Sequence, residues 1–390
     1  LEAVRADRLI DSRVRLDRDL LWIDDLPFPV DEPTFLAGAG KAASAMGRAI
    51  RPLLGDRFAG GLLVTKTGSA EPVDGIEILE SDHPVPSAAS LEAGRRMREF
   101  LEARRAGERI VFVLSGGASA LLEDPVDGVT LDDLRRTTEL LLGCGAPIEH
   151  VNAVRTALSR IKGGGLARAA HPARTAVVVL SDVLGDDLAA IGSGPFDQGR
   201  SRNPLDIVRR YGIDRELPPG VLARLRAFRE TERVAPVPHR IVGSNGIAVE
   251  TLAARLAERG YRVRTGPTMT GEARDFPLPF PEPGEAIVGG GECTVTLRGD
   301  GRGGRAQELA LARSIDLAGT DAVLLVGSTD GADGPTDVAA AIVDGRPLPG
   351  VAEALARSDS HAVLAAAGTL VRTGPTGTNL NDVYAIARPR

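Results

Sequence analysis

The chain has 390 residues, of which 43% are hydrophobic, and its formal net charge is −6. This length suggests two domains, and the hydrophobic content is too high for a disordered protein. No apolar run approaches the ~18 residues that span a bilayer, and no basic block stands out, so we expect neither a membrane nor a nucleic acid as a partner. The charged first residues lack an apolar signal core and the two cysteines form no CxxC motif, which predicts a cytoplasmic protein.

Short apolar runs alternate along the chain with polar, glycine-containing loops and helix-like segments. Six of these runs are predicted to be buried strands, at residues 34–37, 61–64, 110–114, 176–180, 240–242 and 322–326. Near-continuous Val, Ile and Leu in such runs is typical of parallel sheets covered by helices. Ligands bind these sheets beyond the carboxyl ends of the strands, where each polar loop follows its run.

The segments between the strands carry helical patterns. Helices are expected at residues 41–54, 132–142, 152–161, 247–258 and 304–317. Regular patterning breaks near residues 230–238, so we predict an α/β protein with one domain over residues 1–232 and another over 233–390.

Only three of the 47 basic residues are lysines, namely Lys41, Lys66 and Lys162. Each lies within two residues of a glycine, although with 46 glycines in the chain this can arise by chance. A lysine kept in a chain that otherwise uses arginine is a candidate for a role that a rigid, planar guanidinium cannot fill.

The loop from Gly38 through Gly40 and Lys41 to Ala43 matches the dinucleotide pattern GxGxxA. Backbone amides at the start of the following helix can hold a phosphate or a carboxylate. A nicotinamide site also needs an acidic residue at the end of the next strand, but that strand ends in Val64-Thr65-Lys66. The loop does not match a Walker motif either. It therefore indicates a cationic anion site, with a tight strand–helix turn as the alternative explanation for the glycines.

A second loop follows the strand at residues 110–114. Its hydroxyls and consecutive glycines form a nest of hydrogen-bond donors for an anion, from Ser115, Gly116, Gly117 and Ser119. It is not the GxSxG of a serine hydrolase. A third candidate segment begins with Asn152 and Arg155 on a helix and ends with Lys162, Gly163 and two more glycines, where a helix cap needs only one glycine.

Two acidic loops follow strands, at residues 181–187 and 329–337. Their spacing does not match an EF-hand, but Mg²⁺ bound with ATP needs only one or two protein carboxylates. Asp182, Asp187 and Asp330 are the candidate metal ligands, and the alternative is that Asp and Gly simply form turns here.

The last third of the chain adds another cation and further polar loops. Arg305 opens a helix after two glycines and can clamp phosphate oxygens at two points. His83 could be a base, although a lone histidine beside proline is more often a turn residue. The other candidate binding residues are Ser193, Asn245, Glu292, Asp333, Asp337, Thr378 and Asn379.

Taken together, these strings resemble the glycerate 2-kinase family, whose C-terminal part is called the MOFRL domain. The segments that carry the resemblance run in order along nearly the whole chain: residues 38–42, 82–84, 115–121, 158–165, 181–187, 303–308, 330–337 and 373–382. The resemblance implies a Rossmann-like N-terminal domain, a smaller α/β C-terminal domain and a site in the cleft between them. It also implies transfer of the γ-phosphoryl group of ATP to the 2-hydroxyl of D-glycerate, with Mg²⁺ or another divalent cation, and catalytic roles for Lys41 and Arg305.

The chain departs from the family pattern at two places. The family usually has Arg-Lys-His-Leu-Ser where this chain has Thr156 and Ala157 after Arg155, and Arg-Asn-Gln-Glu where it has Ala306 after Arg305. These losses of polar groups bear on the identity of the phosphoryl acceptor more than on the reaction class. An NAD(P)H-dependent hydroxypyruvate reductase and a non-catalytic sugar-acid binding protein are the alternatives, and a homodimer is left open.

Overall fold

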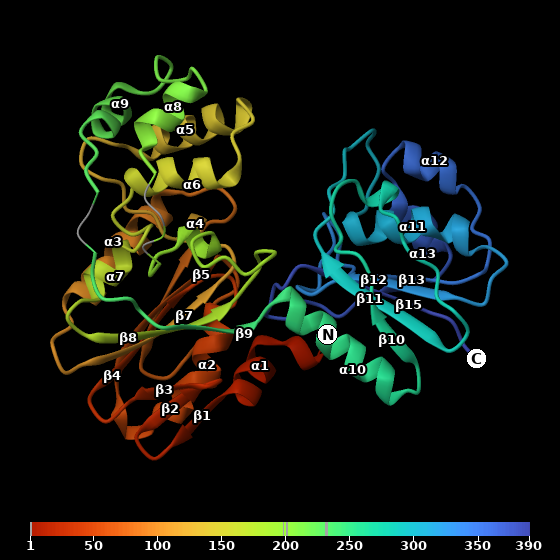
Figure 1. Ribbon diagram of the computed structural model, residues 1–390, viewed down its shortest axis with the longest axis horizontal. Coiled ribbons are helices and arrows are strands. Elements are labelled where there is room, and N and C mark those ends of the chain that lie inside the picture. Colours follow the sequence, from red (N-terminus) through yellow and green to blue (C-terminus); the bar gives the residue numbers. More distant parts are fainter. Residues whose placement is uncertain (1, 198, 200–201, 231–232) are drawn as a thin grey trace. The chain divides into compact units, whose positions relative to one another are not determined.

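The computed structural model describes residues 2–197, 199, 202–230 and 233–390. Its contacts divide the chain into two compact units (Figure 1). The N-terminal unit comprises Ile10–Leu180 and Asp186–Val242. The C-terminal unit comprises Gly243–Arg390, the loop Ser181–Gly185 and the residues up to Leu9.

The N-terminal unit is built on a six-stranded sheet with the order β6-β5-β4-β7-β8-β9. Strands β4, β5, β6, β7 and β8 pair in parallel, and the order is that of Rossmann-type folds. The strands are β4 (Thr34–Ala39), β5 (Phe58–Lys66), β6 (Ile76–Ser81), β7 (Arg109–Ser115), β8 (Arg174–Leu180) and β9 (His239–Gly243). The Rossmann-like N-terminal domain is therefore confirmed.

Helices cover this sheet because its central strands are apolar on both faces. Every residue of β7 is buried. Helix α2 (Ala43–Leu54) packs on β4 and β5, while α3 (Ala88–Glu102) packs on β6 and on α7 (Gly165–Ala170). Helix α3 begins at a capping box in which the Ser87 hydroxyl accepts a hydrogen bond from a backbone amide.

Two further groups of elements complete this unit. A small antiparallel sheet contains β1 (Val14–Asp17), β2 (Leu20–Ile23) and β3 (Leu26–Pro29), and follows α1 (Ala6–Arg13). Helices α5 (Leu131–Gly143), α6 (Ile148–Ala157), α8 (Pro204–Arg210) and α9 (Pro219–Arg226) share a separate apolar core. Figure 1 shows these four helices gathered at the end of the unit opposite β1–β3.

The C-terminal unit contains a second six-stranded sheet, with the order β10-β11-β15-β12-β13-β14. Only β10 and β11 pair in parallel, because the last strand of the chain, β15, enters antiparallel between β11 and β12. The strands are β10 (Arg262–Thr265), β11 (Glu285–Gly291), β12 (Val323–Ser328), β13 (Ala340–Val343), β14 (Leu370–Val371) and β15 (Asp382–Ala387). The second α/β domain is confirmed, with a mixed sheet.

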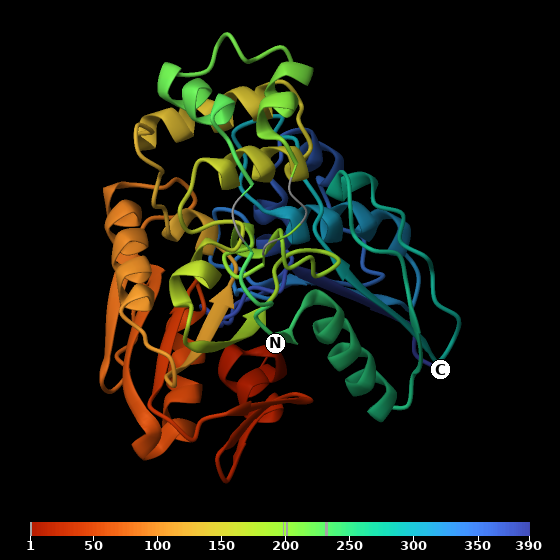
Figure 2. The same ribbon diagram turned by 60° about the vertical axis from the view of Figure 1, so that its left-hand side comes forward.

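Helices lie on both faces of this second sheet. Figures 1 and 2 show α10 (Asn245–Glu258) on one face and α11 (Arg305–Leu317), α12 (Val351–Ala356) and α13 (Ser360–Ala366) on the other. Apolar residues of α11, β11, β12, β13 and β15 form the core of the unit. No helix in the described part of the chain is long and apolar enough to cross a membrane.

The limits of the two units differ from the predicted domains, 1–232 and 233–390, in three places, the first being that the residues up to Leu9 group with the C-terminal unit. Strand β9 belongs to the N-terminal sheet, because Val177 N donates to Pro238 O at 2.9 Å and Ser181 N donates to Gly243 O at 2.8 Å. The loop Ser181–Gly185 groups instead with the C-terminal unit. The predicted boundary itself touches residues 231–232, outside the described part of the chain, and the predicted interdomain cleft stays a prediction.

Candidate functional site

The strand order of the N-terminal unit places two of the predicted loops side by side. Strands β4 and β7 are neighbours, but the chain continues from them toward opposite edges of the sheet. The loops after these strands are joined by hydrogen bonds, since Lys41 N donates to Gly116 O at 2.9 Å and Ala42 N donates to Ser115 Oγ at 3.0 Å. Such a switch point is where open α/β sheets bind ligands.

Glycine is required at both loops by close packing. A Cβ on Gly40, whose φ is +134°, would lie 2.1 Å from Ser115 Oγ. A Cβ on Gly117, whose φ is +86°, would lie 3.0 Å from the His83 ring and 3.2 Å from Lys41 Cγ. Gly38 is a packing residue, because a Cβ there would lie 2.2 Å from a methyl group of Val113 on β7. The glycines thus bring Lys41 and His83 together around Gly117.

His83 lies in a positive environment. Burial, together with the charges of Lys41 and Lys66, lowers the pKa of its imidazole to about 4. The ring is therefore neutral at neutral pH and available as a proton acceptor. The sequence alone did not decide whether His83 is a base or a turn residue. Its place beside Gly117 and Lys41 could not be inferred from the Asp-His-Pro string.

Next to this loop, three predicted residues form one hydrogen-bonded group. Ser119 Oγ lies 2.9 Å from Ser193 Oγ, and Arg155 Nη2 donates to Ser119 Oγ at 2.8 Å. Burial lowers the pKa of the Arg155 guanidinium, while the charge of Glu123 raises it. Asn152 is half-buried on α6, one turn before Arg155.

Lys162 supports this group from beneath and is not itself accessible. Its ammonium lies 2.9 Å from Glu123 Oε2 and donates to the carbonyl oxygens of Ser119 and Leu122 at 3.0 and 3.2 Å. All three ammonium protons are therefore occupied, and the side chain is 2% exposed. We infer that Lys162 holds Ser119 in place instead of contacting a ligand as predicted.

The glycines after Lys162 have a similar structural role. Gly163 N donates to Ser193 O at 3.0 Å, and a Cβ on Gly163, whose φ is +55°, would lie 2.1 Å from Thr156 Cγ2. Close packing against Thr156, and not against a ligand, explains this glycine. Glu123, the partner of Lys162, was missed because it belongs to no motif.

In the C-terminal unit, Arg305 is held by two carboxylates. Its Nε lies 3.1 Å from Asp382 Oδ2, and its Nη1 pairs with Glu292. Burial raises the pKa of Asp382 to about 7, while the charge of Arg305 lowers it. Asp382 ends the segment 373–382, which carries part of the family resemblance, but was not itself chosen as a site residue.

Two other predicted residues of this unit hold the backbone around Arg305. The Asp333 carboxylate accepts hydrogen bonds from Ala306 N at 3.0 Å and Gln307 N at 2.9 Å, and so caps α11. The Asn245 amide donates to the carbonyl oxygens of Leu380 and Asp382 at 2.8 and 2.9 Å. Both residues act on the main chain beside the arginine.

The remaining predicted residues of the unit are less closely placed. Asp337 is 73% exposed and pairs with Arg372 at 3.0 Å. Asn379 Oδ1 accepts a hydrogen bond from Asn381 N at 3.2 Å. The buried Thr378 Oγ1 has no hydrogen-bond partner among the described residues, so this hydroxyl remains a candidate for a ligand contact.

The three predicted metal ligands do not form one cluster. Asp187 lies in the N-terminal unit, whereas Asp182 and Asp330 lie in the C-terminal unit. Asp187 Oδ1 accepts from Ala189 N at 3.0 Å, and Asp330 Oδ1 accepts from Ser328 Oγ at 2.8 Å. The second oxygen of each accepts no hydrogen bond from the described residues. Among the described residues, no group of three or more His, Cys, Asp or Glu could hold a metal ion. This donor set fits only a metal whose other ligands come from phosphate and water.

Comparisons with known proteins agree with this arrangement. A domain of unknown function, DUF4147, matches residues 1–226, and the MOFRL family matches residues 285–382. The D-glycerate 2-kinase of Thermotoga maritima is 36% identical, with 98% of this chain and 94% of the relative covered. A putative hydroxypyruvate reductase of Agrobacterium vitis is 37% identical, with 97% of this chain and 93% of the relative covered.

The fold comparison gives the same result. The crystal structure of a glycerate kinase from Thermotoga maritima matches with a TM-score of 0.87 and 34% identity, covering 99% of this chain and 96% of that one. A crystal structure from Pyrococcus horikoshii OT3 matches with a TM-score of 0.85 and 32% identity, covering 100% and 95%. By sequence and by fold, this chain belongs to the glycerate 2-kinase family with its C-terminal MOFRL domain.

Proposed function

We propose that this chain is an ATP-dependent kinase that transfers the γ-phosphoryl group to the 2-hydroxyl of D-glycerate, giving 2-phosphoglycerate and ADP. The observation that carries the proposal is the gathering of cationic groups at the switch point of the N-terminal sheet. Lys41 lies against Gly117 there, and its charge and that of Lys66 both act on His83. The names of the relatives support the reaction class.

The arrangement suits phosphoryl transfer, which depends on positioning and charge neutralisation more than on covalent chemistry. Lys41 and Lys66 would neutralise the oxygens of the transferred phosphate or of the acceptor carboxylate. Ser119 and Ser193, oriented by Arg155, would donate hydrogen bonds to the same anion. The neutral His83 ring would accept the proton that the attacking hydroxyl loses.

Arg305 would supply a second cation, from the C-terminal unit. Its guanidinium is oriented by Asp382 and Glu292, so it loses little rotamer freedom when it binds an anion. Removal of one preorganised charge from such a site costs on the order of 10²–10³ in rate.

Mg²⁺ bound with ATP would neutralise charge on the phosphate oxygens. Asp187 is the carboxylate best suited to hold it, because it is exposed and one of its oxygens accepts no hydrogen bond within the described part of the chain. The cytoplasmic location and the homodimer stay predictions.

A coupled ADP-release assay with D-glycerate and ATP tests the proposal, and ³¹P NMR of the product separates 2-phosphoglycerate from 3-phosphoglycerate. We expect glycerate-dependent turnover that falls on the order of 10²–10³ in Lys41→Met and Arg305→Met. Lys41→Arg keeps the charge and tests whether the compact ammonium is required. A folded Lys41→Met protein with full turnover would refute the assigned role.

A hydroxypyruvate reductase is the second candidate, because two Agrobacterium vitis relatives carry that putative name. Its test is the oxidation of NADH or NADPH with hydroxypyruvate. We expect none, because β5 ends in Thr65 and Lys66, without the acid that binds the ribose of a nicotinamide cofactor. A non-catalytic binding protein, the third candidate, would bind glycerate without releasing ADP.

A further inference from the structure

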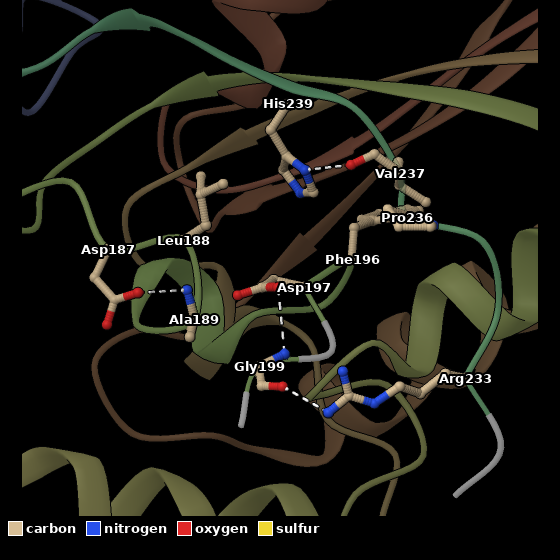
Figure 3. A pocket seen from close by; sticks show the side chains of 10 residues that line it. All are labelled: Asp187, Leu188, Ala189, Phe196, Asp197, Gly199, Arg233, Pro236, Val237 and His239. Atoms are coloured by element: carbon tan, nitrogen blue, oxygen red, sulfur yellow. Dashed lines mark hydrogen bonds between the residues drawn. The ribbon is translucent and has the colours of Figure 1, made fainter. Parts of the chain in front are cut away.

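The N-terminal unit contains a pocket of about 610 Å³ whose lining, apart from Asp187, has no role above (Figure 3). This volume is in the range of small-molecule sites. Polar and apolar groups contribute about equally to its lining. The lining residues are Asp187, Leu188, Ala189, Phe196, Asp197, Gly199, Arg233, Pro236, Val237 and His239.

His239 presents a hydrogen-bond acceptor to this pocket. Its Nδ1 lies 2.8 Å from the carbonyl oxygen of Val237, which can only accept, so Nδ1 must carry a proton. Figure 3 shows the second ring nitrogen turned away from that carbonyl. Burial lowers the pKa of the imidazole, so the ring is neutral and its Nε2 carries a lone pair.

The other polar groups are mainly acceptors as well. Asp197 and Asp187 contribute carboxylates to the lining, and each uses one oxygen to accept a backbone amide, from Gly199 and Ala189 respectively. The one cation, Arg233, is 59% exposed and donates to Gly199 O at 3.0 Å. A ligand that fits must therefore offer hydrogen-bond donors together with an apolar surface.

These properties discriminate between the two substrates of the proposed kinase. Glycerate is a small anion without an apolar surface, and the carboxylates of the pocket would repel it. A nucleoside has a flat ring for Leu188 and Pro236 to contact. It also has hydroxyl and amino donors for Asp197 and His239.

The pocket is also continuous with the anion-binding loops along the chain. The segment that contributes Asp187, Leu188 and Phe196 to the lining also contains Ser193, whose hydroxyl lies 2.9 Å from Ser119 Oγ. The segment that lines the pocket is thus also linked by a hydrogen bond to the anion-binding loop.

We propose that this pocket binds the adenosine part of ATP, with Asp197 accepting from ribose hydroxyls and His239 Nε2 accepting from the 6-amino group. The assignment rests on the proposed kinase function for its choice of ligand. It predicts that ATP is preferred to ITP, whose 6-oxo group cannot donate to Nε2.

The test measures ADP binding by calorimetry, separately from turnover. Leu188→Trp fills the pocket and should raise the Kd of ADP at least about tenfold, while the KM of glycerate changes little. Leu142→Trp makes the same change at an exposed position of α5, outside the pocket, and should leave both values unchanged. In the unmodified protein, photolabelling with 2-azido-ADP should mark peptides that contain residues 187–199 or 233–239.

Each result has a definite meaning. Normal ADP binding by a folded Leu188→Trp protein, or labelling confined to other peptides, overturns the pocket assignment even if the kinase is active. ADP binding blocked by Leu188→Trp, in a protein without glycerate-dependent turnover, supports the pocket and overturns the kinase function alone. If Leu188→Trp fails to fold, the photolabelling decides. Equal use of ITP and ATP removes the role given to His239.

Discussion

Arg305 and Asp382 form an ion pair in which the carboxylate is almost completely buried. The Nε of Arg305 lies 3.1 Å from Asp382 Oδ2, and Asp382 is 2% exposed. Burial raises the pKa of this carboxyl group to about 7, and the charges of Asp333 and Glu292 also raise it. The group that fixes the proposed catalytic arginine thus changes its charge near neutral pH.

Asp382→Asn should therefore alter the pH dependence of the kinase. In the wild-type protein the carboxylate that orients Arg305 is lost as the pH falls, so kcat/KM should drop roughly tenfold for each pH unit below 7. In Asp382→Asn this fall in kcat/KM below pH 7 should be absent, and kcat/KM should stay at the low value throughout. The measurement is a pH profile between 5.5 and 8.5, with Asp300→Asn, at an exposed position, as the control. If kcat/KM of Asp382→Asn still falls below pH 7 as in the wild-type protein, another group causes the fall.

The same substitution has a consequence for stability. The pKa of Asp382 in the folded protein lies above its ordinary value of 3.8, so its contribution to stability is complete below about pH 4 and is lost as the pH rises through 7. Asn imitates the protonated form. Denaturant unfolding should therefore show that the stability of the wild-type protein falls relative to Asp382→Asn between pH 5 and pH 8; a difference independent of pH would contradict the raised pKa.

His83 provides a second titration with the opposite sign. Its pKa is lowered to about 4 by burial and by the charges of Lys41 and Lys66. The stability from the neutral ring is present above its ordinary value of 6.5 and is lost as the pH falls through about 4. NMR titration of the ring should show this low pKa in the wild-type protein and in Lys41→Arg, and a higher pKa in Lys41→Met. The same pKa in both variants would mean that Lys41 does not act on His83.

The loops at the switch point could be predicted because parallel strands place their carboxyl ends at one edge of a sheet. Residues at the carboxyl ends of β4 and β7, such as Lys41 and Ser115, could therefore be placed at one edge of the sheet from apolar runs and glycines alone. The strand order that makes these loops adjacent could not be predicted, because it depends on long-range pairing.

The roles of single polar residues were harder to predict. The sequence suggests that Asp333 binds a ligand, but in the structure its carboxylate caps α11. The residues around Asp333 in the sequence do not show whether it caps a distant helix or contacts a metal or a phosphate. Lys162 was chosen because it is a rare lysine near glycines. Its partner Glu123 comes from another part of the chain, so the string could not show that its ammonium is occupied.

Removal of Lys162 should cost stability more than specific activity. Both members of its pair with Glu123 are nearly inaccessible, at 2% and 4% exposed. Lys162→Met leaves the buried Glu123 carboxylate unpaired, which should lower the free energy of unfolding by roughly 3–5 kcal/mol. Adding Glu123→Gln removes that charge and should restore a large part of the loss. Arg95→Ala, which breaks exposed pairs with Glu92 and Glu99, should cost far less in the same unfolding experiment. No recovery in the double variant would contradict this account.

Gly40 should be far less tolerant of substitution than Gly68, although both have positive φ angles, of +134° and +79°. A Cβ on Gly40 would lie 2.1 Å from Ser115 Oγ and 2.5 Å from the Ser115 carbonyl oxygen, whereas nothing lies within 4 Å of a Cβ on Gly68. Gly40→Ala adds overpacking of about 1–3 kcal/mol to a backbone strain of about 1–3 kcal/mol, and Gly68→Ala incurs the strain alone.

Urea unfolding of the two variants measures this difference directly. Because the clash at Gly40 also pushes apart the loops joined by Lys41 N and Gly116 O, turnover should fall in Gly40→Ala even where the protein is still folded. Gly68→Ala should keep its activity, since its added methyl group meets open space. Equal losses of stability and turnover in the two variants would show that the contact between the β4 and β7 loops does not position Lys41.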